Sequence, residues 1–301
     1  MVQVKQLKAI PFHWIANLLF GLLLLLTSCQ GTDKHHTTVG GYGIGNMENG
    51  KEAGCWTYYF PNDTIEATGC FDNGMMNGDW KYWYVDGHLK EVINWRRGVA
   101  DGPYLKYFLN EQLEESGTYD SDEKNGLWVY YYPNGERRKL GCFTSGKKNG
   151  EWLSYYINGQ LKSQQYLTDD LPRDSAVFWH PNGQKKELIY YQNHQISGVR
   201  YKWYANGVME ECSHWDKGAL NGEYISYNKK GDTLSFGVYV KGQETGPFIS
   251  YFDTGELHWT GEYQDGKKME WFNYYNKKGQ VVLRERYVDH VLVKKVTLPN
   301  D

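Results

Sequence analysis

The stretch NGLWVYYYPNGERRKLGCFTSGKKNG, residues 125–150, contains two runs of strand-forming residues and two turn signals. Residues 128–132 form the first run, residues 136–143 form the second, and Pro133-Asn134-Gly135 separates them. Asn-Gly between two such runs is the strongest short-range signal for a β-hairpin. The stretch ends on a second Asn-Gly, at residues 149–150, so it predicts one hairpin followed by a tight turn into the next.

The same pattern recurs every 24 residues from residue 51 to residue 290. Stepping by 24 from Gly54 meets Gly at eight of ten positions, the exceptions being Asp174 and Glu270. Stepping from Tyr59 meets an aromatic residue at all ten positions, and stepping from Phe71 meets one at nine. Self-similarity at a fixed period is the signature of a repeat protein. We therefore predict an all-β fold, an elongated array of about ten 24-residue antiparallel β-hairpin repeats in a β-meander solenoid.

The composition agrees with strands joined by tight turns. The chain has 26 Tyr, 12 Trp, 11 Phe and 34 Gly among 301 residues. Aromatic residues favour strands and glycine favours turns, and disordered chains are poor in aromatic residues. The net charge of −3 argues against a nucleic-acid partner, since proteins that bind nucleic acids are typically basic.

The position of the first turn predicts the strand register. If the turn is centred between residues 62 and 63, then Trp56 faces Gly69, and a ring faces a glycine in the same way in four other copies. A ring laid over a cross-strand glycine shields bare backbone. The same register places the residue at position 60 opposite position 65 on the buried face, and Tyr59 on the other face opposite Glu66.

The same register also places Cys55 opposite Cys70. In an exported protein the two thiols can form a disulfide. Whether they do depends on which kind of antiparallel pair they occupy, so the sequence leaves both states open.

The N-terminus has the features of a targeting segment. Lys5 and Lys8 precede an apolar run over residues 14–26 that is too short to span a membrane, and Leu26-Thr27-Ser28-Cys29 follows. This arrangement resembles a bacterial lipoprotein signal, with a secretory signal and an incidental cysteine as the alternative. We expect residues 1–28 to be a signal peptide, residues 29–50 a flexible tether lipidated at Cys29, residues 51–290 the repeats, and residues 291–301 a C-terminal cap or tail. The expected location is the bacterial cell envelope, with the protein held at the membrane by its N-terminal lipid.

The repeated units, of which residues 125–146 are the clearest, resemble the variant form of the MORN repeat. The resemblance covers some 240 residues and implies an elongated array of hairpins. It also implies a scaffold, or a module that contacts proteins or lipids, and similar proteins carry an antitoxin label. The sixth copy departs from the pattern, with Asp174 and Ala176 where other copies have glycine and a ring.

No sequence motif indicates catalysis, a cofactor or a metal site. The nucleophile elbow, the P-loop, H-E-x-x-H and C-x-x-C are all absent from the sequence,. Asp120, Asp122 and Glu123 superficially suggest a calcium loop, but Lys124 occupies a ligand position and Asn125 stands where the loop needs glycine. We therefore expect a protein that is not an enzyme.

The aromatic residue found in all ten copies is the candidate binding feature. Such a row of rings could stack on sugars or hold a protein partner, or it could cover the second face of the sheet by packing on the stems of charged residues. The expected function is a non-catalytic binding or scaffold module for an envelope protein or glycan, and the alternative is an antitoxin or immunity protein that neutralises a toxin. This ring row comprises Tyr59, Trp83, Tyr107, Tyr131, Tyr155, Trp179, Trp203, Tyr227, Tyr251 and Tyr275.

Overall fold

The structure, a computed structural model, describes residues 33–36 and 41–299. Within these residues the regular elements are 24 β-strands. No helix among them is long and apolar enough to cross a membrane. The all-β prediction is therefore confirmed for the described chain.

The chain divides into two units, one ending at Gly102 and the other beginning at Pro103. This boundary lies inside strand β7 (Val99–Tyr107). In the first unit, each strand pairs antiparallel with the next one in sequence. Its strands are β1 (Asp33–His36), β2 (Tyr42–Glu48), β3 (Lys51–Tyr59), β4 (Ile65–Asp72), β5 (Met75–Trp83) and β6 (Leu89–Arg96).

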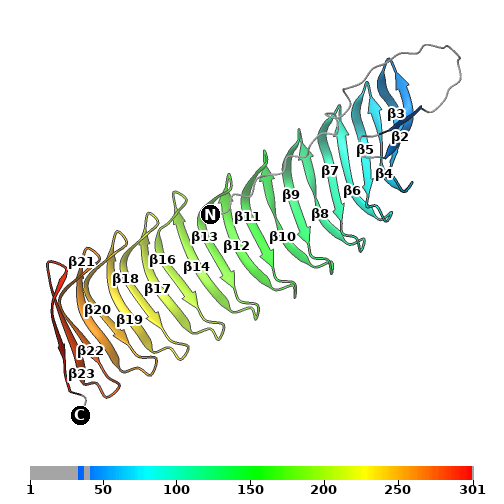
Figure 1. The fold of residues 1–301 in the computed structure, drawn as a ribbon. Helices are drawn as coiled ribbons and strands as arrows, with labels where there is room; N and C mark the ends of the chain where they lie inside the picture. The colour runs from blue at the N-terminus through cyan, green and yellow to red at the C-terminus, as the bar shows by residue number, and fades with distance from the viewer. Residues whose placement is uncertain (1–32, 37–40, 300–301) are drawn as a thin grey trace, which may run out of the picture. The chain divides into compact units, whose positions relative to one another are not determined.

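The second unit is also an antiparallel meander, and Figure 1 shows its hairpins side by side in sequence order. Each copy of the repeat forms one hairpin, as predicted, and the first strand of the seventh copy is split in two. The strands are β8 (Leu113–Asp120), β9 (Glu123–Tyr131), β10 (Arg137–Thr144), β11 (Lys147–Tyr155), β12 (Leu161–Thr168), β13 (Leu171–Trp179), β14 (Lys185–Gln192), β15 (Gln195–Ile196), β16 (Gly198–Trp203), β17 (Met209–Asp216), β18 (Ala219–Tyr227), β19 (Thr233–Val240), β20 (Gln243–Tyr251), β21 (Leu257–Gln264), β22 (Lys267–Tyr275), β23 (Val281–Val288) and β24 (Val291–Thr297).

Regular structure extends beyond the ten copies at both ends. β1 and β2 lie inside the segment expected to be a flexible tether, so that expectation is wrong for residues 33–36 and 42–48. Of these two strands, β2 continues the period. It matches the second strand of a further copy, since Gly45 stands 24 residues before Gly69. In the expected cap or tail, β24 matches the first strand of another copy and pairs with β23. The signal segment, residues 1–28, and Cys29 lie outside the described residues.

The predicted register holds along most of each hairpin and changes near the turn. In the first copy, Gly54 pairs with Phe71, Trp56 with Gly69 and Tyr58 with Ala67. A bulge then shifts the register by one residue, so that Tyr59 pairs with Ile65. The expected pairing of Tyr59 with Glu66 is therefore wrong.

The expected pairing of position 60 with position 65 is also wrong. Phe60 follows the last residue of β3, and its backbone N–H donates to the Thr64 carbonyl at 2.8 Å. Position 60 therefore closes the turn.

The core is one face of the sheet, built from stacked aromatic rings. The Trp56 and Phe71 positions supply most of its large buried residues, and Trp128 is fully buried. In the first unit, Phe71 lies edge to face between Trp56 and Trp80, with ring centroids 6.2 and 5.0 Å apart. The second unit contains two such runs, Tyr104–Tyr119–Trp128–Phe143–Trp152 and Tyr224–Tyr239–Phe248–Tyr263–Phe272–Tyr287. We call these runs the aromatic spine.

The ring that covers each strand glycine comes from the following copy, which corrects the expectation of a clasp within one hairpin. A Cβ atom added to Gly69 would lie 2.1 Å from the ring of Trp80. The Trp80 indole N–H also donates to the Cys70 carbonyl at 3.1 Å. The same contact recurs at Gly45, Gly117, Gly141, Gly237 and Gly261. The glycine and the ring therefore join consecutive hairpins.

The turns between the two strands of each copy are also joined to one another. The Asn182 side chain caps its own turn by accepting from the Gln184 N–H, and its amide group donates to the Ala205 carbonyl of the next copy at 2.6 Å. The Tyr156 hydroxyl likewise donates to the Trp179 carbonyl at 2.8 Å. These bonds fix successive turns at a constant spacing and so position the ring row, which lies immediately before them.

Candidate functional site

The structure places every member of the ring row at or beside the last residue of the first strand of its copy. All ten rings are partly exposed, neither buried nor free in solvent. Two of the rings stack on described neighbours: Tyr59 lies against Tyr42 with centroids 4.9 Å apart, and Trp203 lies against Tyr201 with centroids 5.7 Å apart. The row is therefore a half-exposed aromatic surface, and either role considered from the sequence is compatible with its burial.

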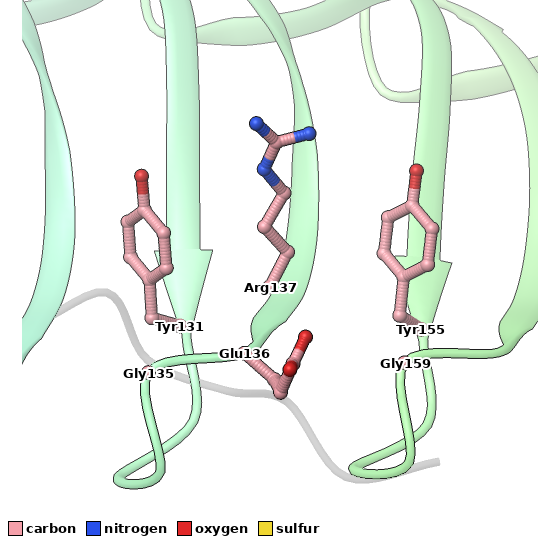
Figure 2. Close-up of a pocket in the computed structure, with 6 residues that line it drawn as sticks. All are labelled: Tyr131, Gly135, Glu136, Arg137, Tyr155 and Gly159. Atoms are coloured by element: carbon pink, nitrogen blue, oxygen red, sulfur yellow. The ribbon is translucent and has the colours of Figure 1, made fainter.

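A shallow hollow lies between two members of the row. It has a volume of about 410 Å³ and is lined by Tyr131, Gly135, Glu136, Arg137, Tyr155 and Gly159. Figure 2 shows the two tyrosine rings pointing the same way, with the Arg137 side chain standing between them. Tyr131 ends β9, Arg137 begins β10 and pairs with it, and Tyr155 ends β11. Three successive strands thus position the three side chains.

Arg137, which lines the hollow, occupies a position that is usually apolar. The residue paired with the ring-row member is Ile65 in the first copy, Leu161 in the fifth and Leu257 in the ninth. Lys185 is the other cation at this position, and it pairs with Trp179. The register change beside the ring row, which the sequence did not reveal, is what brings these cations opposite the rings.

A second cationic environment lies close by in sequence, on the spine. Lys139 lies 4.8 Å above the Trp152 ring, and Lys148 lies 5.4 Å from the same centroid. Burial, together with the nearby Lys148, lowers the pKa of Lys139 from its ordinary 10.5 to about 8. The fourth and fifth copies therefore place positive charge near aromatic rings both in the spine and at the ring row.

The aromatic spine is interrupted where the sixth and seventh copies depart from the pattern. Arg200 occupies the Trp56 position, and its Nε donates to Glu187 at 2.7 Å. Glu211 also receives a hydrogen bond from Lys202, at 3.0 Å, and one from the Ser213 hydroxyl. We call these five residues the polar interruption. The irregular residues at this position indicated an exception in the sequence, but not that Arg200 would pair with acids on two neighbouring strands.

The two cysteines of the first hairpin lie opposite each other, as the predicted register requires. Cys55 and Cys70 pair across β3 and β4 and form a disulfide. Cys142 and Cys212 are free thiols.

The histidines of the sixth copy bond to backbone groups. His180 lies 2.7 Å from the Trp203 carbonyl, and His194 lies 3.0 Å from the Pro172 carbonyl. Among the described residues, no cluster of three or more His, Cys, Asp or Glu side chains could hold a metal ion.

The described residues of the calcium-like segment form a turn. Asp120 ends β8 and Glu123 begins β9, and the two residues between them have positive φ angles. Lys124 bonds to Glu115 and lies 3.8 Å over the Trp128 ring. The segment is thus the turn that connects two consecutive hairpins.

Comparison with known proteins identifies the repeat. The model of the MORN repeat variant matches residues 124–144, 148–169 and 175–193. No match was found among curated proteins.

Two solved structures show only weak likeness to the chain. The crystal structure of TcdB2-TccC3-Cdc42 matches with 11% identity and a TM-score of 0.17, over 83% of this chain and 16% of that chain. The crystal structure of TcdB2-TccC3 without its hypervariable C-terminal region matches with 10% identity and a TM-score of 0.15, over 87% of this chain and 20% of that chain. The chain thus spans a fifth or less of each of these chains, and likeness at this level carries no argument about function.

The matched segments lie in the fourth, fifth and sixth copies. They share their strand order, turn position and bulge with the copies around them. The fourth, fifth and sixth copies are therefore MORN repeat variants, and the copies around them have the same strand and turn arrangement.

Proposed function

We propose that this chain is a non-catalytic binding module that holds a protein or glycan partner on its ring row, at a bacterial cell envelope. The observation that supports the proposal is the half-exposed aromatic residue that every copy places beside its turn. Large planar side chains offer contact area at little cost in conformational entropy, and they dominate binding hot spots. The MORN repeat variant is a repeat type of binding and scaffold modules, which agrees with this role.

The ring row is tested by replacing Tyr107, Tyr131 and Tyr155 with Ala and probing a glycan array and an envelope extract. We expect binding to be lost while the far-ultraviolet circular dichroism of the β-sheet is retained. The matched control is the triple Phe variant, which keeps the rings and removes only the hydroxyls. If the Ala variant unfolds while the Phe variant binds normally, a single Ala change at Tyr131 measures binding in a chain that remains folded. Full binding by a folded Ala variant would show that the row only packs.

The envelope location rests on the leader and on lipidation at Cys29. The short apolar run ending in Leu-Thr-Ser-Cys supports this part of the proposal. We expect Cys29→Ser to release the protein from membranes and to abolish labelling with a palmitate analogue. Retention of the Ser variant in the membrane fraction would contradict a lipid anchor. No contact among the described residues favours the alternative of toxin neutralisation.

A further inference from the structure

In the fourth and sixth copies, the residue paired with the ring-row member is a cation. Arg137 pairs with Tyr131, and Lys185 pairs with Trp179. The other eight copies carry Ile, Leu, Met, Thr or Val at the same position. A cation opposite a surface ring is therefore confined to one part of the second unit.

In the part of the chain that the structure describes, the side chains of these two cations have no hydrogen-bond or ion-pair partner. Both side chains are exposed, and no hydrogen bond or ion pair joins either of them to another described residue. By contrast, Lys202 and Lys106 each reach a carboxylate, at 3.0 and 3.1 Å. Arg137 and Lys185 therefore hold donors that are available to a ligand.

The neighbouring residues increase the positive charge of this region. In the fourth, fifth and sixth copies, residues 136–138, 160–162 and 184–186 carry five cations and one carboxylate, that of Glu136. At the equivalent three positions, the other seven copies contain Lys90 as their only Lys or Arg. The cations are Arg137, Arg138, Lys162, Lys185 and Lys186. The region is thus a basic segment within a chain whose net charge is negative.

We propose that this basic segment binds an acidic glycan, a polysaccharide that carries carboxylates on its sugars. The rings of Tyr131, Tyr155 and Trp179 contact the flat apolar faces of the sugars, and the guanidinium of Arg137 holds a carboxylate through two parallel hydrogen bonds. The proposal rests on the proposed binding function of the ring row and specifies its ligand. The hollow between the tyrosines, about 410 Å³, provides room for one sugar beside Arg137.

The spacing of the cations favours a polymer over a single sugar. Arg137 and Lys185 lie two copies apart, which is four strands, or about 19 Å at 4.8 Å per strand. One acidic monosaccharide cannot reach both cations, whereas a chain with repeated carboxylates can. Binding at the second cation then becomes intramolecular, which raises the overall affinity.

The test is affinity electrophoresis of the mature chain carrying Cys29→Ser, in gels that contain polygalacturonate or its fully methyl-esterified form. The two polymers have the same sugars and differ in charge. We expect the acidic polymer to retard the protein, and we expect high salt to weaken this effect. The dissociation constant should be at least about tenfold larger for the R137Q/K185Q double variant. The matched control is K217Q/K241Q, which removes two exposed cations from the turns between copies and is expected to bind like the unmodified chain.

Each other outcome identifies what is wrong. If the esterified polymer binds equally well and R137Q/K185Q changes nothing, the acidic specificity is overturned while glycan binding by the ring row stands. Binding to vesicles with anionic headgroups, but to neither polymer, would overturn the proposal in favour of a membrane surface. If neither polymer nor vesicle binds, the proposal is overturned as well, and the Tyr107, Tyr131 and Tyr155 variants then decide the proposed function independently.

Discussion

Glycine has two separate roles in each copy, and each role predicts a different cost of substitution. At the Gly54 position all ten residues have a positive φ angle, including Asp174 at 57° and Glu270 at 51°. At the Gly69 position the backbone is ordinary, and the ring of the next copy occupies the space of a side chain. The first glycine is required by conformation and the second by close packing.

Substituting alanine in the two roles should separate them. Gly126→Ala places its Cβ in open space but in a left-handed conformation, so we expect a loss of about 1 kcal/mol in the free energy of unfolding. Gly141→Ala would place its Cβ 2.2 Å from the Trp152 ring, and we expect a loss of about 3 kcal/mol or more. Glu270→Gly relieves the left-handed strain and should stabilise by about 1 kcal/mol. Urea unfolding measures all three, and equal costs for the two alanine variants would contradict the distinction.

The lowered pKa of Lys139 predicts that the free energy of unfolding depends on pH, and it also gives the sign of that dependence. Between about pH 8 and the ordinary value of 10.5, the unfolded chain keeps a proton that the folded chain has released. Stability therefore rises with pH through this window, and the cost of the buried charge is fully present below it. Lys139→Met should raise the urea midpoint at pH 7, and its advantage should shrink by pH 10. Lys147→Met, at an exposed site, is the control, and an advantage for Lys139→Met that does not change with pH would contradict the assignment.

At the scale of the strand, the polar interruption replaces ring packing with ion pairs. The side chains of Arg200 and Glu187 are 20% and 16% exposed, so each depends on its partner for solvation. Removing one member of such a pair leaves an uncompensated charge, which costs more than the pair itself contributes. The interruption is thus an alternative way to join consecutive hairpins, with stricter requirements on its partners.

A double-mutant cycle tests this dependence. We expect Arg200→Leu to lower the free energy of unfolding by about 2 kcal/mol, because it leaves the Glu187 carboxylate without its ion-pair partner and removes one of the cations next to Glu211. Adding Glu187→Leu should recover most of this loss. Calorimetry or urea unfolding of the four proteins gives the coupling energy. Additive losses would show that the two side chains act independently.

At the scale of the whole molecule, the sequence predicted the strands, the turns and most of the register, because period and turn chemistry are local signals. The sequence misassigned the ring that covers Gly69. Trp56 lies 13 residues before this glycine and Trp80 lies 11 residues after it, and because the two rings are one 24-residue period apart, the period cannot distinguish them. The bulge before Tyr59 also escaped prediction, since one extra residue on one strand leaves the period unchanged. β2 escaped prediction because residues 30–50 are rich in Gly, Thr and His, a composition typical of flexible tethers, although Gly45 stands 24 residues before Gly69,. At the candidate site, the rings were predictable, and the pairing of Arg137 with Tyr131 depended on that bulge.

Because each hairpin contacts the ones next to it, the second unit should tolerate loss of one complete copy. Deleting residues 243–266, the ninth copy, joins Gly242 to Lys267 in phase and places the Phe272 ring over Gly237, where Phe248 now lies. We expect retained β-sheet circular dichroism and a urea m-value lower by about a tenth, in proportion to the surface removed. Deleting residues 243–254 instead removes β20 alone and brings two second strands together, so that Gly237 loses the Phe248 ring and gains no ring in its place. That shorter deletion should unfold the hairpins around it, and survival of both deletions with equal stability would contradict the copy-to-copy clasp.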